Sequence, residues 1–161
     1  VRGKRIALLQ RTVANAGARS VRIVQSSAHE APPFTAAFDA VLVDAPCSGL
    51  GTIRRDPDIR WRRTPDELPV LAAAQRTMLA QAATVVRPGG RLVYSTCSSE
   101  PEENEQVVAA FLTDHPHFQT AAPSSFGSGP CADLLDASGA LQTLPFRHGL
   151  ESFFAVSLVR V

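Results

Sequence analysis

The sequence predicts an α/β protein built on a mainly parallel, doubly wound sheet. Two observations indicate this fold. Short apolar runs that are typical of buried strands alternate with longer segments whose apolar side chains recur at helical spacing. Two of these runs, at 40–43 and 91–96, each lead into a cysteine, at positions 47 and 97. A length of 161 residues suits one domain with its own core.

The first forty residues predict a helix, a strand and a loop before the first cysteine. Residues 5–16 carry apolar side chains at helical spacing, and Gly17 is placed to end this helix. Residues 21–24 have the pattern of a short strand, and 26–37, with two prolines, that of a loop. Residues 38–43 predict the strand that leads to Cys47.

A long helix is predicted between the two cysteines. Thr64 is placed as its N-cap, with Pro65 at the first helical position and Glu67 completing a capping box. We expect one face of this helix to be core rather than a cofactor site: Leu68, Leu71, Gln75, Met78, Leu79, Ala82 and Val86. The sequence Pro-Gly-Gly at 88–90 is expected to end the helix and turn the chain into the second strand.

A second capping box follows Cys97. Ser99 and Glu102 have the required spacing, and Pro101 falls within the first turn of the expected helix. The rest of the chain predicts a strand at 118–122, a Ser/Gly/Pro loop at 123–130 and a closing strand at 152–161.

Composition excludes several classes of protein. The net charge of +1 does not by itself indicate a nucleic-acid partner, and no apolar run is long enough to cross a membrane. The three cysteines contain no CxxC pair, and the four histidines share no ligand spacing, so we expect neither a disulfide framework nor a metal site. Free thiols and the lack of a secretory signal favour a reducing cytoplasm. Cys131 falls in no motif, and we interpret it as structural.

The two strand-end cysteines are the candidate reactive groups. Cys97 is expected just before a helix N-terminus, which favours a thiolate, although nearby glutamates oppose this. Cys47 has three open interpretations: a second nucleophile, a thiol base, or a small residue in a tight loop. Asp44, at the end of its strand, is placed either to hydrogen-bond a ligand or to cap the loop.

A basic segment follows the first cysteine. Residues 53–63 contain five arginines and one tryptophan, among them Arg54, Arg55, Arg60 and Trp61. Arginine suits phosphates and an indole can stack on an unpaired base, so these four residues are candidates for RNA binding. The alternative is a solvated loop whose arginines pair with its own aspartates and whose Trp61 is a packed anchor.

Three motifs together resemble a known family. They are Asp-Ala-Pro-Cys-Ser-Gly at 44–49, Ile-Arg-Arg-Asp-Pro-Asp-Ile-Arg-Trp at 53–61, and Tyr-Ser-Thr-Cys-Ser at 94–98, the last followed by Pro-Glu-Glu-Asn-Glu at 101–105. In this order and spacing the chain resembles the Sun/Fmu-type RNA (cytosine-5) methyltransferases, which modify small-subunit ribosomal RNA. The resemblance implies a class I, Rossmann-like methyltransferase sheet with helices on both faces.

The resemblance also implies a reaction and roles for residues. Cys97 would add to C6 of a cytosine, whose C5 would then take a methyl group from S-adenosylmethionine. Asp44 would hold the base edge, and Cys47 would assist release, although the two cysteines could exchange roles. Asp44, Pro46 and Ser27 are the positions expected to contact the cofactor.

Two features of the family pattern have no counterpart in the chain. The glycine-rich cofactor loop is absent, and Ser27 stands where the family has an acidic residue. We therefore expect residues 1–161 to be the C-terminal part of a catalytic domain, without its first strands and without an N-terminal RNA-binding domain. Such a part would bind cofactor weakly. The alternative is a non-catalytic RNA-binding module that keeps the fold.

Overall fold

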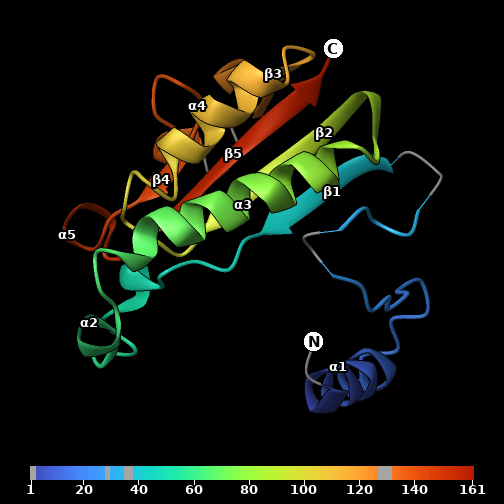
Figure 1. Cartoon of the computed structure of the whole chain (residues 1–161), viewed down its shortest axis with the longest axis horizontal. Helices are drawn as coiled ribbons and strands as arrows, with labels where there is room; N and C mark the ends of the chain where they lie inside the picture. Colours follow the sequence, from blue (N-terminus) through green and yellow to red (C-terminus); the bar gives the residue numbers. More distant parts are fainter. Residues whose placement is uncertain (1–2, 28–29, 35–37, 127–131) are drawn as a thin grey trace.

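The computed structural model describes residues 3–27, 30–34, 38–126 and 132–161 (Figure 1). Its main elements, in chain order, are α1 (Gly3–Asn15), β1 (Phe38–Asp44), α2 (Ile59–Arg62), α3 (Glu67–Ala83), β2 (Val86–Thr96), α4 (Glu105–Asp114), β3 (Phe118–Thr120), β4 (Leu141–Thr143), α5 (Pro145–His148) and β5 (Phe153–Arg160). Cys131, interpreted as structural, lies outside the described residues. No described helix is both long and apolar enough to span a bilayer.

The strands form one open sheet in the order β1-β2-β5-β3, with β4 also paired to β5. β1 and β2 are parallel, whereas β5 runs antiparallel to β2, β3 and β4. The prediction of a mainly parallel sheet is therefore wrong for the described part of the chain. A helical crossover, α3, joins the parallel pair, while β4 reaches β5 through the short α5 segment, which favours antiparallel pairing.

The core lies between this sheet and two helices. α3 and α4 pack against each other, and α3 also contacts β1 and β2 (Figure 1). The fully buried apolar side chains come from these elements: Leu79, Val86, Leu92, Val107 and Leu158. Helix α3 buries Gln75, Met78 and Leu79, so its expected face is core. Val86 belongs instead to β2, because α3 already ends at Ala83 and residues 88–90 lie within the strand.

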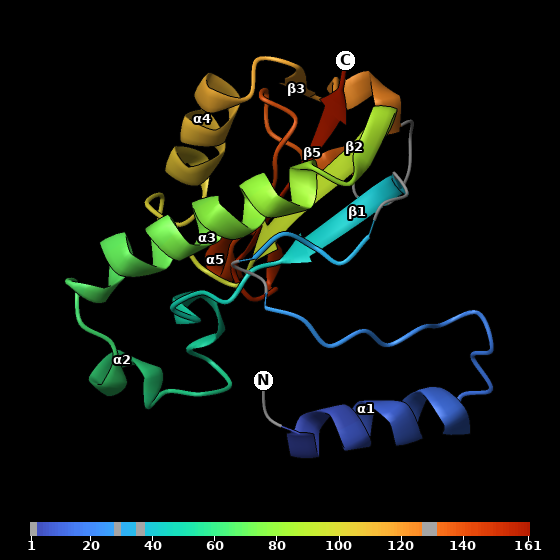
Figure 2. The same cartoon turned by 45° about the vertical axis from the view of Figure 1, so that its right-hand side comes forward.

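The N-terminal segment lies apart from the sheet. In both views α1 and the chain that follows it are separated from the strands (Figures 1 and 2), and α1 buries none of its residues. Gly17 ends the helix with a left-handed backbone, φ 63°, as expected. The predicted strand at 21–24 is absent: these residues pair with no described strand, although β1 lies at the end of the sheet and pairs only with β2.

Both predicted capping boxes are wrong. α3 starts at Glu67, after Asp66, and no side chain caps it. Pro69 accounts for this shift: it has no N–H, which costs nothing at the third helical position but would break a bond in a helix that began at Pro65.

The helix predicted after Cys97 is α4, and it starts after Asn104. The Ser99 hydroxyl donates to the Glu100 carboxylate, 2.8 Å away, instead of capping a helix. The side-chain amide of Asn104 donates to the Ser98 carbonyl, 3.0 Å away. These contacts hold 99–104 in turns, so the helix begins later than the spacing predicted.

Candidate active site

The two cysteines meet at the carboxyl ends of β1 and β2. The strands are parallel neighbours, with Asp44 opposite Ser95, so the loops that follow leave the same edge of the sheet. The sulfur atoms of Cys47 and Cys97 lie 3.1 Å apart, and both side chains are partly buried. The sequence placed the cysteines on neighbouring strands, and the structure brings them into direct contact.

The surroundings of Cys47 favour its protonated form. Burial, then the hydrogen bond and the charge of Cys97, raise the pKa of Cys47 to about 12, against smaller opposing effects of backbone N–H groups at Gly49 and Cys97. At neutral pH Cys47 is therefore a thiol, and it can donate its proton toward the sulfur of Cys97.

A buried carboxylate holds the two cysteine loops together. Glu103 is fully buried. One of its oxygens accepts from the Ser48 backbone N–H and from Gln75 Nε2, each at 2.9 Å. The other accepts from the hydroxyls of Ser48 and Ser98, each at 2.6 Å. Because Ser48 follows Cys47 and Ser98 follows Cys97, this carboxylate links the residues next to both thiols.

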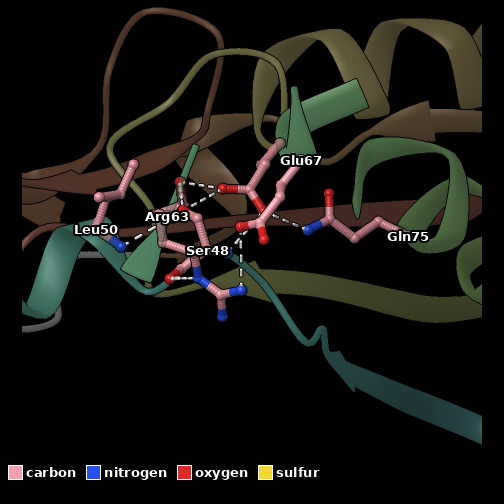
Figure 3. A network of polar contacts seen from close by, with 7 residues as sticks. Ser48, Leu50, Arg63, Glu67 and Gln75 are labelled. Atoms are coloured by element: carbon pink, nitrogen blue, oxygen red, sulfur yellow. Dashed lines mark hydrogen bonds and ion pairs between the residues drawn. The ribbon is translucent and has the colours of Figure 1, made fainter. Parts of the chain in front are cut away.

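Further contacts extend the network around Ser48. Figure 3 shows Ser48 between Arg63 and Gln75. Arg63 Nε donates to the Ser48 carbonyl, 2.9 Å away, and the same arginine pairs with Glu67 at 3.3 Å. Gln75 also donates to the Pro46 carbonyl, 3.0 Å away. The loop from Pro46 to Ser48 is thus anchored to the start of α3 and to its buried face.

Gly51 connects this loop to the last strand. Its N–H donates to the Cys97 carbonyl at 3.1 Å, and its own carbonyl accepts from the Ser152 N–H at 3.0 Å. A Cβ at Gly51 would lie 2.1 Å from the Ser152 oxygen and 2.8 Å from the Cys97 oxygen. Only glycine allows three backbone segments to approach so closely.

Asp44 and Ser27 lie on one cavity of about 310 Å³ at the edge of β1. Its other lining includes Glu30, Phe34 and Met78. The exposed Asp44 accepts a long hydrogen bond, 3.4 Å, from the Ser95 hydroxyl. Carboxylates beside apolar walls fit a ligand with hydroxyl groups and a flat ring, such as an adenosine. Pro46 does not line this cavity, and its carbonyl is bonded to Gln75.

The arginine-rich segment divides into two sets. Arg62 pairs with Asp56 at 2.7 Å, as the solvated-loop interpretation expected, whereas Arg63 pairs with Glu67 of α3, outside the segment. Trp61, however, is 77% exposed, with the Arg60 guanidinium 5.0 Å from the centre of its ring, so it is no packed anchor.

Arg54 and Arg55 turn toward another part of the chain. Arg54 donates to the Gly149 carbonyl at 3.2 Å, and Arg55 pairs with Glu151 at 2.7 Å. Within the described residues no cluster of three or more His, Cys, Asp or Glu side chains could hold a metal ion.

Sequence reasoning missed the network around Glu103. The glutamate was counted only as a source of negative potential beside Cys97, and Gln75 only as part of an apolar face. Buried polar residues must find partners, so a glutamine on an otherwise apolar helix face was the signal available.

The sequence of the chain is similar to those of one family of proteins. Residues 1–159 match the family model described as 16S rRNA methyltransferase RsmB/F. A probable ribosomal RNA small subunit methyltransferase B of Synechocystis is 37% identical over 158 residues, which is 97% of this chain and 35% of that protein. A probable small subunit methyltransferase B of Bacillus subtilis is 40% identical over 121 residues, 75% of this chain and 27% of that protein.

Solved structures agree with this similarity. PH0851 has a TM-score of 0.87 and 34% identity, covering 99% of this chain and 35% of its own. NSun6 from Pyrococcus horikoshii, solved with SFG, has a TM-score of 0.82 and 28% identity, covering 99% of this chain and 40% of its own. The Rossmann-like α/β fold class is thereby confirmed. The chain spans about a third of the length of these relatives.

Proposed function

The chain belongs to the 16S rRNA methyltransferase RsmB/F family, and we propose that it is part of the catalytic domain of an RNA (cytosine-5) methyltransferase that uses S-adenosylmethionine. One observation supports this proposal most directly: two thiols 3.1 Å apart at the carboxyl ends of neighbouring parallel strands. A module that only bound RNA would need neither thiol.

Cys97 is the proposed nucleophile. Its thiolate adds to C6 of the cytosine, and the electron pair displaced toward C5 makes that carbon nucleophilic. S-Adenosylmethionine supplies an electrophilic methyl group, which C5 takes. Loss of the C5 proton then restores the double bond and expels the Cys97 thiolate. The target base must leave its stack to expose C6 to the sulfur.

Cys47 is the proposed release residue. In the free protein it is a thiol, because burial and Cys97 raise its pKa to about 12. Once Cys97 is bonded to carbon, it carries no charge and no longer serves as that hydrogen-bond partner. The hydrogen bond and the charge of Cys97 then no longer raise the pKa of Cys47, while burial, the largest cause, remains, so Cys47 gives up its proton more readily than in the free protein. The assignment of base to Cys47 therefore fits the step after methyl transfer.

Asp44, Ser27 and the cavity at the edge of β1 are the proposed cofactor contacts. The apolar walls suit the adenine ring, and Asp44, the last residue of β1, lines this cavity and could also hold the edge of the cytosine. Pro46 would contribute indirectly, by fixing the backbone of the loop from Pro46 to Ser48. We further propose that residues 1–161 form only part of the catalytic domain and bind cofactor weakly alone.

The exposed residues of 53–63 are the proposed RNA contacts. Trp61 offers an open ring for stacking, and Arg54, Arg55 and Arg60 supply cations for phosphates. Ribosomal RNA of the small subunit, in the cytoplasm, is the proposed substrate because the relatives are named for it.

A methyl-transfer assay tests the proposal. The full gene product is incubated with radiolabelled S-adenosylmethionine and unmodified 16S ribosomal RNA, and digested nucleosides are identified by mass spectrometry. We expect 5-methylcytidine with the wild type and none with Cys97→Ala. RNA binding without any methyl transfer by the wild type would favour the non-catalytic binding module instead.

A further inference from the structure

A second cavity, which shares no lining residue with the cavity of the proposed cofactor contacts, is linked to the cysteine loops through the backbone. It has a volume of about 420 Å³ and is formed by Arg54 and Arg55 on one side and by the chain from Gly149 to Phe153 on the other. Two backbone hydrogen bonds connect it to the cysteine loop: Ser152 N–H to the Gly51 carbonyl, and Gly51 N–H to the Cys97 carbonyl. The cavity residues Glu151 and Phe153 are thus connected to Cys97 through Ser152, which lies between them, and Gly51.

The lining of this cavity offers the groups that a nucleotide needs. Phe153 opens β5 and leaves 42% of its surface exposed, which is enough for a base to stack on. Phe153 is fixed in place, since its N–H donates to the Thr143 hydroxyl, 2.9 Å away. On the opposite side, Arg54 is held by the Gly149 carbonyl with the rest of its guanidinium available to an oxyanion.

The charges in the cavity suit a single phosphate. Glu151 is 10% exposed and pairs with Arg55 at 2.7 Å, so these two charges compensate each other. Among the described residues Arg54 forms no ion pair with a carboxylate, and its guanidinium donates to the neutral Gly149 carbonyl. One net positive charge beside an aromatic face matches one nucleotide of an RNA chain.

We propose that this cavity is the subsite for the nucleotide adjacent to the target cytosine. The base of that nucleotide stacks on Phe153, and its phosphate binds Arg54. Such a subsite would help the target cytosine leave the stack. Unstacking the cytosine costs free energy, and binding of the adjacent nucleotide offsets part of that cost. This inference rests on the proposed function, since it assumes an RNA whose target base reaches Cys97.

A protein–RNA double-mutant cycle tests the stacking contact. The full gene product binds a fluorescein-labelled nine-nucleotide RNA with one central cytosine among uridines, and affinity is measured by fluorescence anisotropy. Two further RNAs carry an abasic site immediately 5′ or 3′ of the cytosine. The variants are Phe153→Leu, which keeps an apolar side chain, and Phe146→Leu as control, since Phe146 is 86% exposed and lies outside the cavity lining.

The expected result is specific to one neighbour. In the wild type and in Phe146→Leu, one of the two abasic sites lowers affinity roughly five- to fifty-fold, which lies within the range for loss of one stacked base. In Phe153→Leu affinity for the intact RNA falls by a similar factor, and the same abasic site then costs little more. Equal losses from the abasic site in wild type and Phe153→Leu would overturn the subsite.

The phosphate contact has its own test. Arg54→Gln is expected to reduce the dependence of log affinity on log salt by about 0.7, the value for one phosphate on a single strand. Arg76→Gln, on the exposed side of α3, should leave that slope unchanged. An unchanged slope in Arg54→Gln would overturn the assignment. If the wild type bound none of the RNAs, the proposed function would fail and the subsite with it.

Discussion

Replacing Glu103 by alanine should destabilise the fold through the loop that carries Cys47. The carboxylate accepts four hydrogen bonds in a site without solvent. In Glu103→Ala the Ser48 backbone N–H loses the acceptor described for it, whereas Gln75 keeps the Pro46 carbonyl and the two serine hydroxyls, 3.3 Å apart, can bond each other.

The magnitude follows from this accounting. One buried donor left unpaired costs about 1–3 kcal/mol. The cavity left by the missing side-chain atoms adds a comparable amount, so we expect a loss of about 2–6 kcal/mol in the free energy of unfolding. Glu103→Gln should lose less, about 1 kcal/mol, because its amide oxygen can replace one carboxylate oxygen and its NH₂ can donate to the hydroxyls.

Urea unfolding of the full gene product, followed by circular dichroism, measures these losses. Glu105→Ala is the matched control, an exposed glutamate in the first turn of α4, and should lose less than about 1 kcal/mol. Equal losses in Glu103→Ala and Glu105→Ala would refute the argument that the buried carboxylate holds the two loops.

Three further predictions concern single residues. Gly51→Ala should cost roughly 3 kcal/mol or more in urea unfolding, because its Cβ would meet two backbone oxygens; Gly3→Ala, which meets nothing within 4 Å, should cost none, and equal effects would contradict the close-approach argument. Trp61→Ala should change the free energy of unfolding by less than about 0.5 kcal/mol yet lower RNA affinity roughly five- to fifty-fold. The control Val70→Ala, at a side chain that is 70% exposed, should change neither quantity. Unaltered affinity in Trp61→Ala would remove Trp61 from the interface. Iodoacetamide should alkylate Cys47 slowly at pH 9 in the wild type, because the pKa of Cys47 is about 12, and faster in Cys97→Ala. Mass spectrometry of peptides measures both rates. Equal rates would show that Cys97 does not raise the pKa of Cys47.

Hydrophobic patterning predicted the parts of the fold that rest on burial. The strands around 38–44 and 91–96 and the helix between them are where the apolar runs placed them. Two neighbouring strands that each end in a cysteine loop were enough to locate the candidate site. The distance between the thiols was beyond the sequence, because it depends on how the loops fold after the strands end.

Local signals failed where a tertiary contact competed with them. The spacing of Ser99 and Glu102 suited a capping box, but buried bonds of Ser98, Glu103 and Asn104 keep that segment in turns. The apolar run at 21–24 suited a strand, yet this segment does not pair with β1, whose outer edge is unpaired among the described strands. Helix α1 was correct in extent, but its periodicity did not show that it buries no residue against the sheet.

The exposed state of Trp61 could not be decided from composition. The same residues suit a packed anchor and an open stacking surface, and only the placement of α2 distinguishes them. Pairing of Arg62 with Asp56 fits the solvated-loop interpretation, while exposure of Trp61 contradicts a packed anchor and leaves Trp61 a proposed RNA contact.

The central claim is that Cys97 attacks the base and Cys47 releases it. The most direct measurement incubates the full gene product, as Cys47→Ala and as Cys97→Ala, with S-adenosylmethionine and 16S ribosomal RNA, followed by a denaturing gel. We expect a protein–RNA adduct that persists only in Cys47→Ala, because attack proceeds there and release does not. An adduct only in Cys97→Ala would exchange the two roles, and no adduct in either variant would contradict the covalent mechanism.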